Sequence, residues 1–153
     1  MKSNNYRPYK RLILWYVRRK NSIIKKALHL EKSYYLYNED IQEICSTWSN
    51  LDCKNVVENM IRKLRQDITD INACPWCEKF SLTCKHCTYK IRHGECSEDG
   101  DDTYTYIIDK AIDRGICTSE WDGIVSFPGM KKLIDDFEVR YYAIKKKEQQ
   151  DYE

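Results

Sequence analysis

The sequence predicts a mainly α-helical fold that forms a single domain with a small cysteine-rich insertion. Apolar residues recur at three- and four-residue steps along most of the chain, which is the spacing of one buried helix face. Only 5 Gly and 3 Pro occur in 153 residues, a composition that disfavours a turn-rich all-β fold. Paired cysteines interrupt the helical pattern between residues 74 and 96. A chain of this length, 1–153, is expected to form one domain.

The first predicted helix covers residues 9–35 and carries most of the basic residues near the N-terminus. Its apolar stripe consists of Tyr9, Ile13, Tyr16, Ile23, Ala27, Leu30 and Tyr34. Leu12, Leu14, Trp15 and Val17 widen this stripe in the first half of the helix. Such a wide apolar face is typical of a helix that is buried or packed against a partner, with its basic residues on the remaining surface.

Two further helices are predicted before the cysteine-rich segment. Residues 39–48 form a short helix with Asn38 as its N-cap, and residues 53–71 form a longer one capped by Asp52. Cys45 and Cys53 fall on these helices, and we expect each to be a small core residue.

Two helices are predicted after it, within residues 103–147. Asp101 or Asp102 can cap a helix over 103–114, and Gly115 stands where a C-terminal glycine belongs. Pro128 is expected in the first turn of the last helix, which runs to about residue 147.

The cysteine-rich segment predicts a structural zinc site. It contains Cys74-Pro-Trp-Cys77, Cys84-Lys-His-Cys87 and His93-Gly-Glu-Cys96. Each C-x-x-C turn directs two thiolates at one point, so two such turns supply the four ligands of a tetrahedral Zn²⁺. Only six residues separate the two cysteine pairs, which is short for a zinc ribbon. A residue outside the two pairs can therefore take the place of one of the four cysteines. The expected ligands are Cys74, Cys77, Cys84 and Cys87, with Cys96, His93 or His86 as possible substitutes.

Other kinds of cysteine site fit the spacing less well. A thioredoxin-type redox pair at Cys74 and Cys77 needs a βαβ context, whereas the flanks here are helical. An iron–sulfur cluster usually shows a closer triple spacing. A catalytic zinc keeps an open position and a general base, and the His93-x-Glu95 pattern follows the cysteines instead of preceding them as in zinc deaminases. No Ser-His-Asp set, P-loop or pair of catalytic carboxylates stands out in the sequence, so we do not expect an enzyme. We expect the segment to form a small zinc-knuckle insertion.

The compartment predicted from the sequence is the cytoplasm. No run reaches 18 apolar residues, and the short apolar stretch 11–17 has no small-residue cleavage site after it. We therefore expect neither a membrane span nor a signal peptide. In a reducing compartment, 8 cysteines indicate metal binding and not disulfides.

Charge is strongly segregated along the chain. Residues 1–36 hold ten Lys or Arg and one acid, a net charge of +9, whereas the other 117 residues carry −7. The basic helix can pair with acids of the same fold or contact nucleic-acid phosphates, with Tyr9, Trp15, Tyr16, Tyr34 and Tyr35 as candidates for stacking on bases. The acidic turn after Cys96 can cap a helix or imitate DNA phosphates in a basic groove of another protein. The candidate partner-binding residues are Arg11, Arg18, Arg19, Lys20, Lys25, Lys26, Glu98, Asp99, Asp101 and Asp102.

The two cysteine pairs followed by Gly94-x-Cys96 resemble a cysteine-rich segment of small phage and prophage proteins. The resemblance covers about 25 of 153 residues, and Thr88 stands where such segments often have proline. It implies a mobile-element protein, and the zinc-containing inhibitors of CRISPR–Cas nucleases are among the proteins of that origin. The function expected on this basis is non-enzymatic binding of a host protein, with a CRISPR–Cas effector nuclease as the implied target. The alternative is a nucleic-acid-binding regulator that uses the basic helix.

Overall fold

The computed structural model describes residues 7–28, 38–65, 75, 79, 110–116 and 127–151. As predicted, the described part is mainly α-helical, and no strand occurs in it. Its longer helices are α1 (Pro8–Leu28), α2 (Asn38–Thr47), α3 (Asn50–Arg65) and α7 (Met130–Asp151). The predictions for residues 29–35, 66–71 and 103–109 lie outside the described residues.

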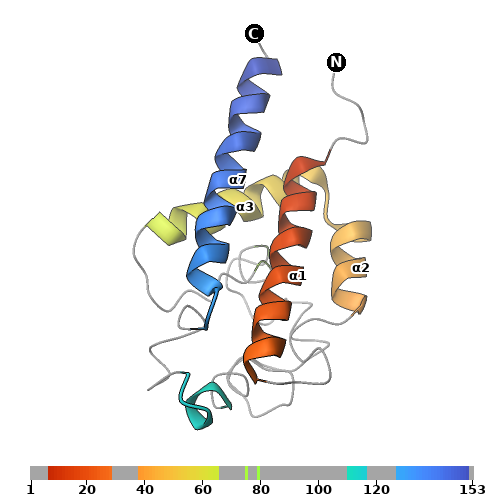
Figure 1. Cartoon of the computed structure of the whole chain (residues 1–153). Coiled ribbons are helices and arrows are strands. Elements are labelled where there is room, and N and C mark those ends of the chain that lie inside the picture. The colour runs from red at the N-terminus through yellow and green to blue at the C-terminus, as the bar shows by residue number, and fades with distance from the viewer. Residues whose placement is uncertain are drawn as a thin grey trace.

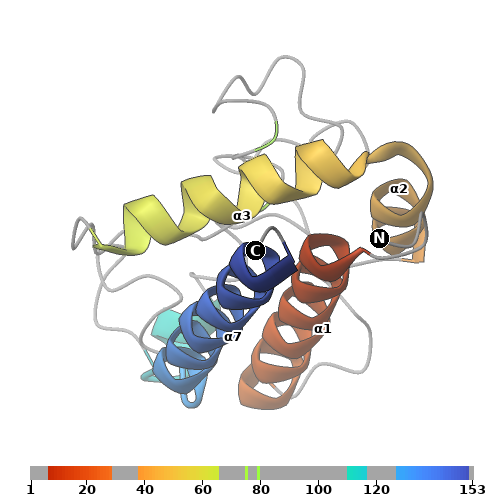
Figure 2. The ribbon, with the colours of Figure 1, turned by 90° about the horizontal axis from the view of Figure 1, so that it is seen from above.

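Helix α1 is the centre of the arrangement, because it contacts α2, α3 and α7. Helices α1 and α7 lie side by side and run in opposite directions, so that the start of α1 and the end of α7 are at the same end of the molecule (Figure 1). Helix α3 crosses the pair at a steep angle, and α2 lies on the side of α1 that faces away from α7 (Figure 2).

The buried face of α1 explains this central position. Its buried apolar residues are Tyr9, Leu12, Ile13, Tyr16, Val17, Ile24 and Leu28. The predicted stripe holds as far as Tyr16, and beyond it the buried face passes through Lys20 and Ile24, leaving Ile23 and Ala27 only partly buried. Tyr16 packs against Phe137 of α7, with ring centroids 5.0 Å apart.

Helix α3 begins with a reciprocal cap. The Ser49 hydroxyl accepts a hydrogen bond from the Asp52 backbone N–H at 3.0 Å, and the Asp52 carboxylate accepts one from the Ser49 backbone N–H at 3.0 Å. This is a capping box in which Asp52 occupies the third helical position. The prediction of Asp52 as the N-cap was therefore wrong, because Ser49 caps the helix and α3 starts at Asn50.

Two glycines with positive φ lie next to helix ends in the second half of the chain: Gly115 follows a helical turn and Gly129 precedes α7. Gly115 has φ +74°, the Gly115 N–H donates to the Ile112 carbonyl, and the Ile116 N–H donates to the Ala111 carbonyl. These two bonds form a Schellman motif and confirm the predicted C-terminal glycine. Helix α7 starts at Met130, after Gly129 at φ +90°, so the prediction that Pro128 lies in its first turn was wrong by two residues.

A polar network joins the second half of α7 to α3. The Glu58 carboxylate accepts hydrogen bonds from the Tyr141 hydroxyl at 3.2 Å and from the Lys145 ammonium at 3.4 Å. The Lys54 ammonium lies 3.8 Å from the Glu148 carboxylate. The basic residues of α3 and α7 in this network therefore have acidic partners within the fold.

The two helical cysteines differ in exposure. Cys53 is buried, which confirms it as a core residue, and burial raises the pKa of its thiol to about 11. Cys45 is exposed, so its prediction as a core residue was wrong. It lies in the last turn of α2, and its backbone carbonyl accepts a hydrogen bond from the Lys10 ammonium.

Candidate nucleic-acid interface

The predicted zinc ligands lie outside the described residues, as do Glu98, Asp99, Asp101 and Asp102 of the acidic turn. Within the part of the chain that the structure describes, no group of three or more His, Cys, Asp or Glu side chains could hold a metal ion. The zinc site and the acidic partner surface therefore remain predictions.

Two residues of the cysteine-rich segment, Pro75 and Lys79, are among the described residues. Pro75 is buried, and the Lys79 ammonium lies 3.6 Å from the Asp52 carboxylate. The same ammonium lies 5.9 Å from the centroid of the Trp48 ring, whose indole N–H donates to Glu43 at 2.8 Å. These contacts attach Lys79 to the junction of α2 and α3.

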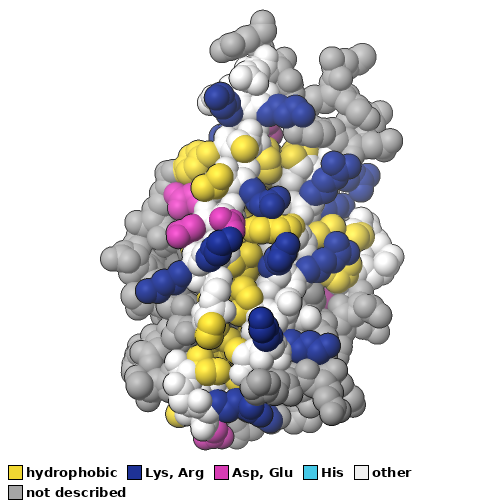
Figure 3. Space-filling view, in the orientation of Figure 1, with side chains coloured by type: hydrophobic (Ala, Val, Ile, Leu, Met, Phe, Trp, Pro, Cys, Tyr) yellow, Lys and Arg dark blue, Asp and Glu magenta, His cyan; other side chains and the backbone are white. Residues whose placement is uncertain are grey.

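Basic side chains form a row along the exposed side of α1, which we call the basic row. Arg11, Arg18 and Lys25 are spaced by seven residues, close to two helical turns, so they lie on one side of the helix about 10 Å apart. Arg19 and Lys26 repeat the same spacing one residue later. In the view of Figure 3, Lys and Arg side chains lie over both α1 and α7, whereas Asp and Glu lie mainly on the side of α7. The row consists of Arg11, Arg18, Arg19, Lys25 and Lys26, all of them exposed.

No acidic residue accompanies the basic row on its own helix, since residues 7–28 contain no Asp or Glu. Among the described residues, the ion pairs join lysines of α3, α7 and position 79 to carboxylates, and none involves the row. No hydrogen bond from a side chain of the row is found in the described part either. The described contacts thus give no support to the hypothesis that acids of the same fold neutralise these five charges.

Two lysines of α1 belong to the core and not to the row. Lys10 is 7% exposed and donates to the Cys45 carbonyl at 3.1 Å, in the last turn of α2, where a helix carries partial negative charge. Lys20 is 0% exposed, and its ammonium lies 5.9 Å from the centroid of the Tyr16 ring. Lys20 was predicted to be a partner-binding residue, and the structure instead places it in the interior. Its position four residues after Tyr16 and four before Ile24 was the signal in the sequence, because it continues the buried stripe.

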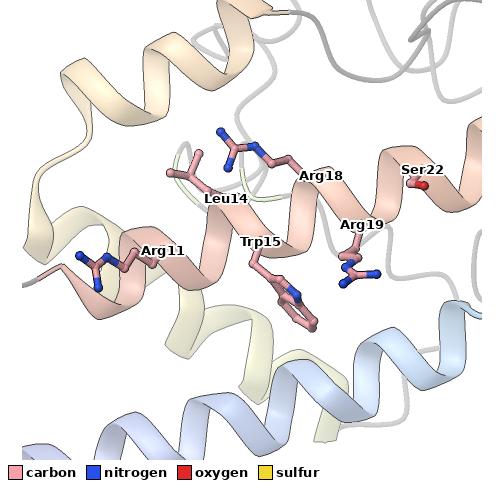
Figure 4. Close-up of a pocket in the computed structure, with 6 residues that line it drawn as sticks. All are labelled: Arg11, Leu14, Trp15, Arg18, Arg19 and Ser22. Carbon is pink, nitrogen blue, oxygen red and sulfur yellow. The ribbon is translucent and has the colours of Figure 1, made fainter.

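A groove of about 520 Å³ lies along the row. In Figure 4, the Trp15 and Arg19 side chains extend from α1 on the side of α7, whereas Leu14 and Arg18 extend on the opposite side. The described residues that line this groove are Arg11, Leu14, Trp15, Arg18, Arg19 and Ser22.

Trp15 connects the groove to α7. The guanidinium carbon of Arg140 lies 4.1 Å from the centroid of the Trp15 ring, within the range of a cation–π contact. Arg140 is exposed and Trp15 is partly buried. Sequence reasoning did not identify Arg140, because nothing local predicts which residue of a helix 125 positions away will cover an aromatic ring.

The other aromatic residues that were candidates for base stacking are not accessible on α1. Tyr9 is 5% exposed and Tyr16 is 0% exposed. Burial, together with the negative charge of Glu148, raises the pKa of Tyr9. Tyr34 and Tyr35 lie outside the described residues. On the described part of α1, Trp15 is therefore the one candidate that reaches the surface.

Comparison with known proteins finds no matching family model, curated protein or solved structure. None of the described helices combines the length and apolar character needed to cross a membrane. The interpretation of the site therefore depends on its own geometry and charge.

Proposed function

We propose that this protein binds nucleic acid, with the basic row of α1 contacting the phosphate backbone. The observation that carries the proposal is that Arg11, Arg18, Arg19, Lys25 and Lys26 are exposed on one helix while no described acid pairs with them. Like charges held this closely repel one another unless counterions or an anionic partner compensate them. A polyanion supplies that compensation along the whole row.

Phosphates fit the chemistry of the row. Arg11, Arg18 and Arg19 present planar guanidinium groups, which donate paired hydrogen bonds to phosphate oxygens. Each phosphate that is neutralised also releases condensed counterions, which favours binding at low salt. Lys25 and Lys26 stand in the last turn of α1, where they also complement the helix dipole. The three arginines lie before that turn, so the dipole does not account for them.

An anionic membrane surface is a weaker candidate for the partner. Amphipathic helices that lie on membranes insert their apolar face between the lipids. The apolar face of α1 is instead buried against the other helices, as in Ile13 and Val17, both 0% exposed. Only the polar face remains to meet a partner, which suits a hydrophilic polyanion.

A gel-shift titration at 50 mM salt tests the proposal, with the wild-type chain, Arg18→Gln/Arg19→Gln and Arg62→Gln/Lys132→Gln. The last variant is a matched control, because it removes two exposed charges from α3 and α7 instead of α1. We expect the wild-type chain and the control to bind a mixed-sequence nucleic acid similarly and the α1 variant to bind much more weakly. Absence of wild-type binding, or equal losses in both variants, would contradict the proposal.

The hypothesis of a host protein partner, with a CRISPR–Cas nuclease as the implied target, stays a prediction. That hypothesis depends on the acidic turn and the cysteine-rich segment, most of which lies outside the described residues. A pull-down from host lysate with and without nuclease treatment distinguishes a host-protein partner from nucleic-acid binding. A protein that is recovered equally after nuclease treatment supports a direct protein partner.

A further inference from the structure

Resting on the proposed function, we infer that the nucleic acid is double-stranded and that Arg140 of α7 contacts its backbone beside the basic row. In this arrangement Trp15 is a positioning residue that holds the Arg140 guanidinium and does not stack on bases. The contact surface then extends from α1 alone to the α1–α7 pair.

The geometry of Arg140 supports its place in the surface. Its guanidinium carbon lies over the Trp15 ring, 4.1 Å from the ring centroid, and Trp15 also lines the groove beside Arg11, Arg18 and Arg19. In both ribbon views α1 and α7 are neighbours, so a residue of α7 can share a ligand with α1 (Figures 1 and 2). No ion pair to a described acid engages Arg140. A planar arginine stacked on a ring loses little further side-chain freedom when it binds a phosphate.

The aromatic residues near the row argue against a single strand. Proteins that bind single strands without sequence preference combine a basic groove with exposed rings on which bases stack. Here Arg140 occupies one face of the Trp15 ring, which is itself partly buried, and Tyr9 and Tyr16 are 5% and 0% exposed. Tyr142 is 40% exposed, but it follows Arg140 by two residues, which places it about 200° further around α7. The described face therefore offers charge without an open stacking platform.

The spacing of the row argues for a stiff ligand. Arg11 and Lys25 are separated by fourteen residues, about 21 Å along a single uninterrupted helix. A rigid row of charges is complementary to phosphates whose positions are fixed by a duplex. Duplex DNA also carries the higher charge density, so that each neutralised phosphate contributes about −0.9 to the salt slope, against about −0.7 for a single strand.

A first experiment compares ligands. Fluorescence anisotropy with a labelled 20-base-pair duplex of mixed sequence, and with each of its strands alone, gives dissociation constants between 50 and 200 mM salt. We expect the duplex to bind more tightly than either strand throughout this range. Equal or tighter binding of the single strands overturns the inference while leaving the proposed function intact, whereas absence of binding to every probe refutes the proposed function itself.

A double-mutant cycle then tests the role of Trp15. Arg140→Gln should weaken duplex binding by about tenfold at 50 mM salt and make the salt slope shallower by about 0.9, as expected for one lost phosphate contact. Trp15→Leu should weaken binding in the wild-type background but change it by less than about twofold in the Arg140→Gln background, because its effect acts through Arg140. An equal loss in both backgrounds overturns the positioning role.

Two conservative variants guard against a folding defect. Trp15→Phe keeps an aromatic ring under Arg140 and should retain most of the duplex affinity that Trp15→Leu loses. Arg140→Lys keeps the charge but not the planar stack, so its affinity should fall between wild type and Arg140→Gln. If Arg140→Lys and Arg140→Gln both bind like the wild-type chain while thermal melts are unchanged, Arg140 makes no contact and the inference is wrong.

Discussion

The ammonium group of Lys10 lies 3.1 Å from the backbone carbonyl of Cys45, so a lysine of α1 closes the C-terminal turn of α2. This contact separates the lysines of α1 into two kinds. Lys10 and Lys20 are buried and hold the fold together, whereas Lys25 and Lys26 are exposed. The net charge of the segment conceals this division, and only the second kind can meet a partner directly.

Lys10→Met should lower the free energy of unfolding by about 1–3 kcal/mol, because a buried charge-assisted hydrogen bond is lost and the Cys45 carbonyl is left without its donor. Urea denaturation measures the change. Lys25→Met is the matched control on the same helix and should change stability by less than about 0.5 kcal/mol, since Lys25 is exposed. Equal effects of the two substitutions would show that Lys10 has no structural role.

Tyr141→Phe should cost about 1 kcal/mol of stability, because the hydroxyl donates to Glu58 across 83 positions of the chain. The effect should shrink when Glu58 is already replaced by Ala, since the acceptor is then absent. Urea denaturation of the two single variants and the double variant measures this coupling. Additive losses would mean that the hydrogen bond contributes nothing to stability.

Ser49→Ala should cost about 1 kcal/mol through loss of the cap of α3. Ser46→Ala is the control, because Ser46 is exposed within α2 and its hydroxyl only accepts a bond from Gln42. Circular dichroism melts of both variants compare the losses. A control that is destabilised as much as Ser49→Ala would contradict the assignment of the cap.

The cap also makes stability depend on pH. The hydrogen bond from the Ser49 backbone N–H to the Asp52 carboxylate, with a smaller effect of the nearby Lys79 ammonium, lowers the pKa of Asp52. A carboxyl with a lowered folded pKa stabilises the fold fully above its unfolded pKa, near 4, and this contribution is lost as pH falls through the folded value. We expect Asp52→Asn to lose less stability than wild type between pH 5 and acid conditions (about pH 2). Identical acid profiles in urea titrations would refute this role.

The predicted zinc site is tested by metal content. We expect about one Zn²⁺ per chain in the purified protein, lost in Cys74→Ser together with a fall in thermal stability, because structural zinc contributes directly to folding. Cys45→Ser is the control, since Cys45 is exposed on α2 and outside the segment 74–96. A wild-type chain that contains no metal, or a Cys74→Ser variant with unchanged metal and melting, would refute the prediction.

The sequence was sufficient to predict α1, α2, α3 and α7 over the described residues, because apolar residues recur in them at helical spacing. Helix boundaries were less certain where two capping residues compete, as Ser49 and Asp52 do, since both side chains accept backbone hydrogen bonds. Counting charges identified the basic segment but did not separate Lys20 from its exposed neighbours, which requires the register of the buried stripe. The Trp15–Arg140 contact depends on how α1 packs against α7, and no local pattern encodes that.

The most direct test of the central claim is the salt dependence of duplex binding. The five basic side chains of the row, together with Arg140, predict that the logarithm of the binding constant falls with log[salt] at a slope of about −5. Replacing Arg11, Arg18 and Lys25 by Gln, the three members of the row that are spaced by seven residues, should reduce the steepness of this slope by about 2.7. A wild-type slope near zero, or a slope that the triple substitution leaves unchanged, would show that α1 does not contact the nucleic-acid backbone.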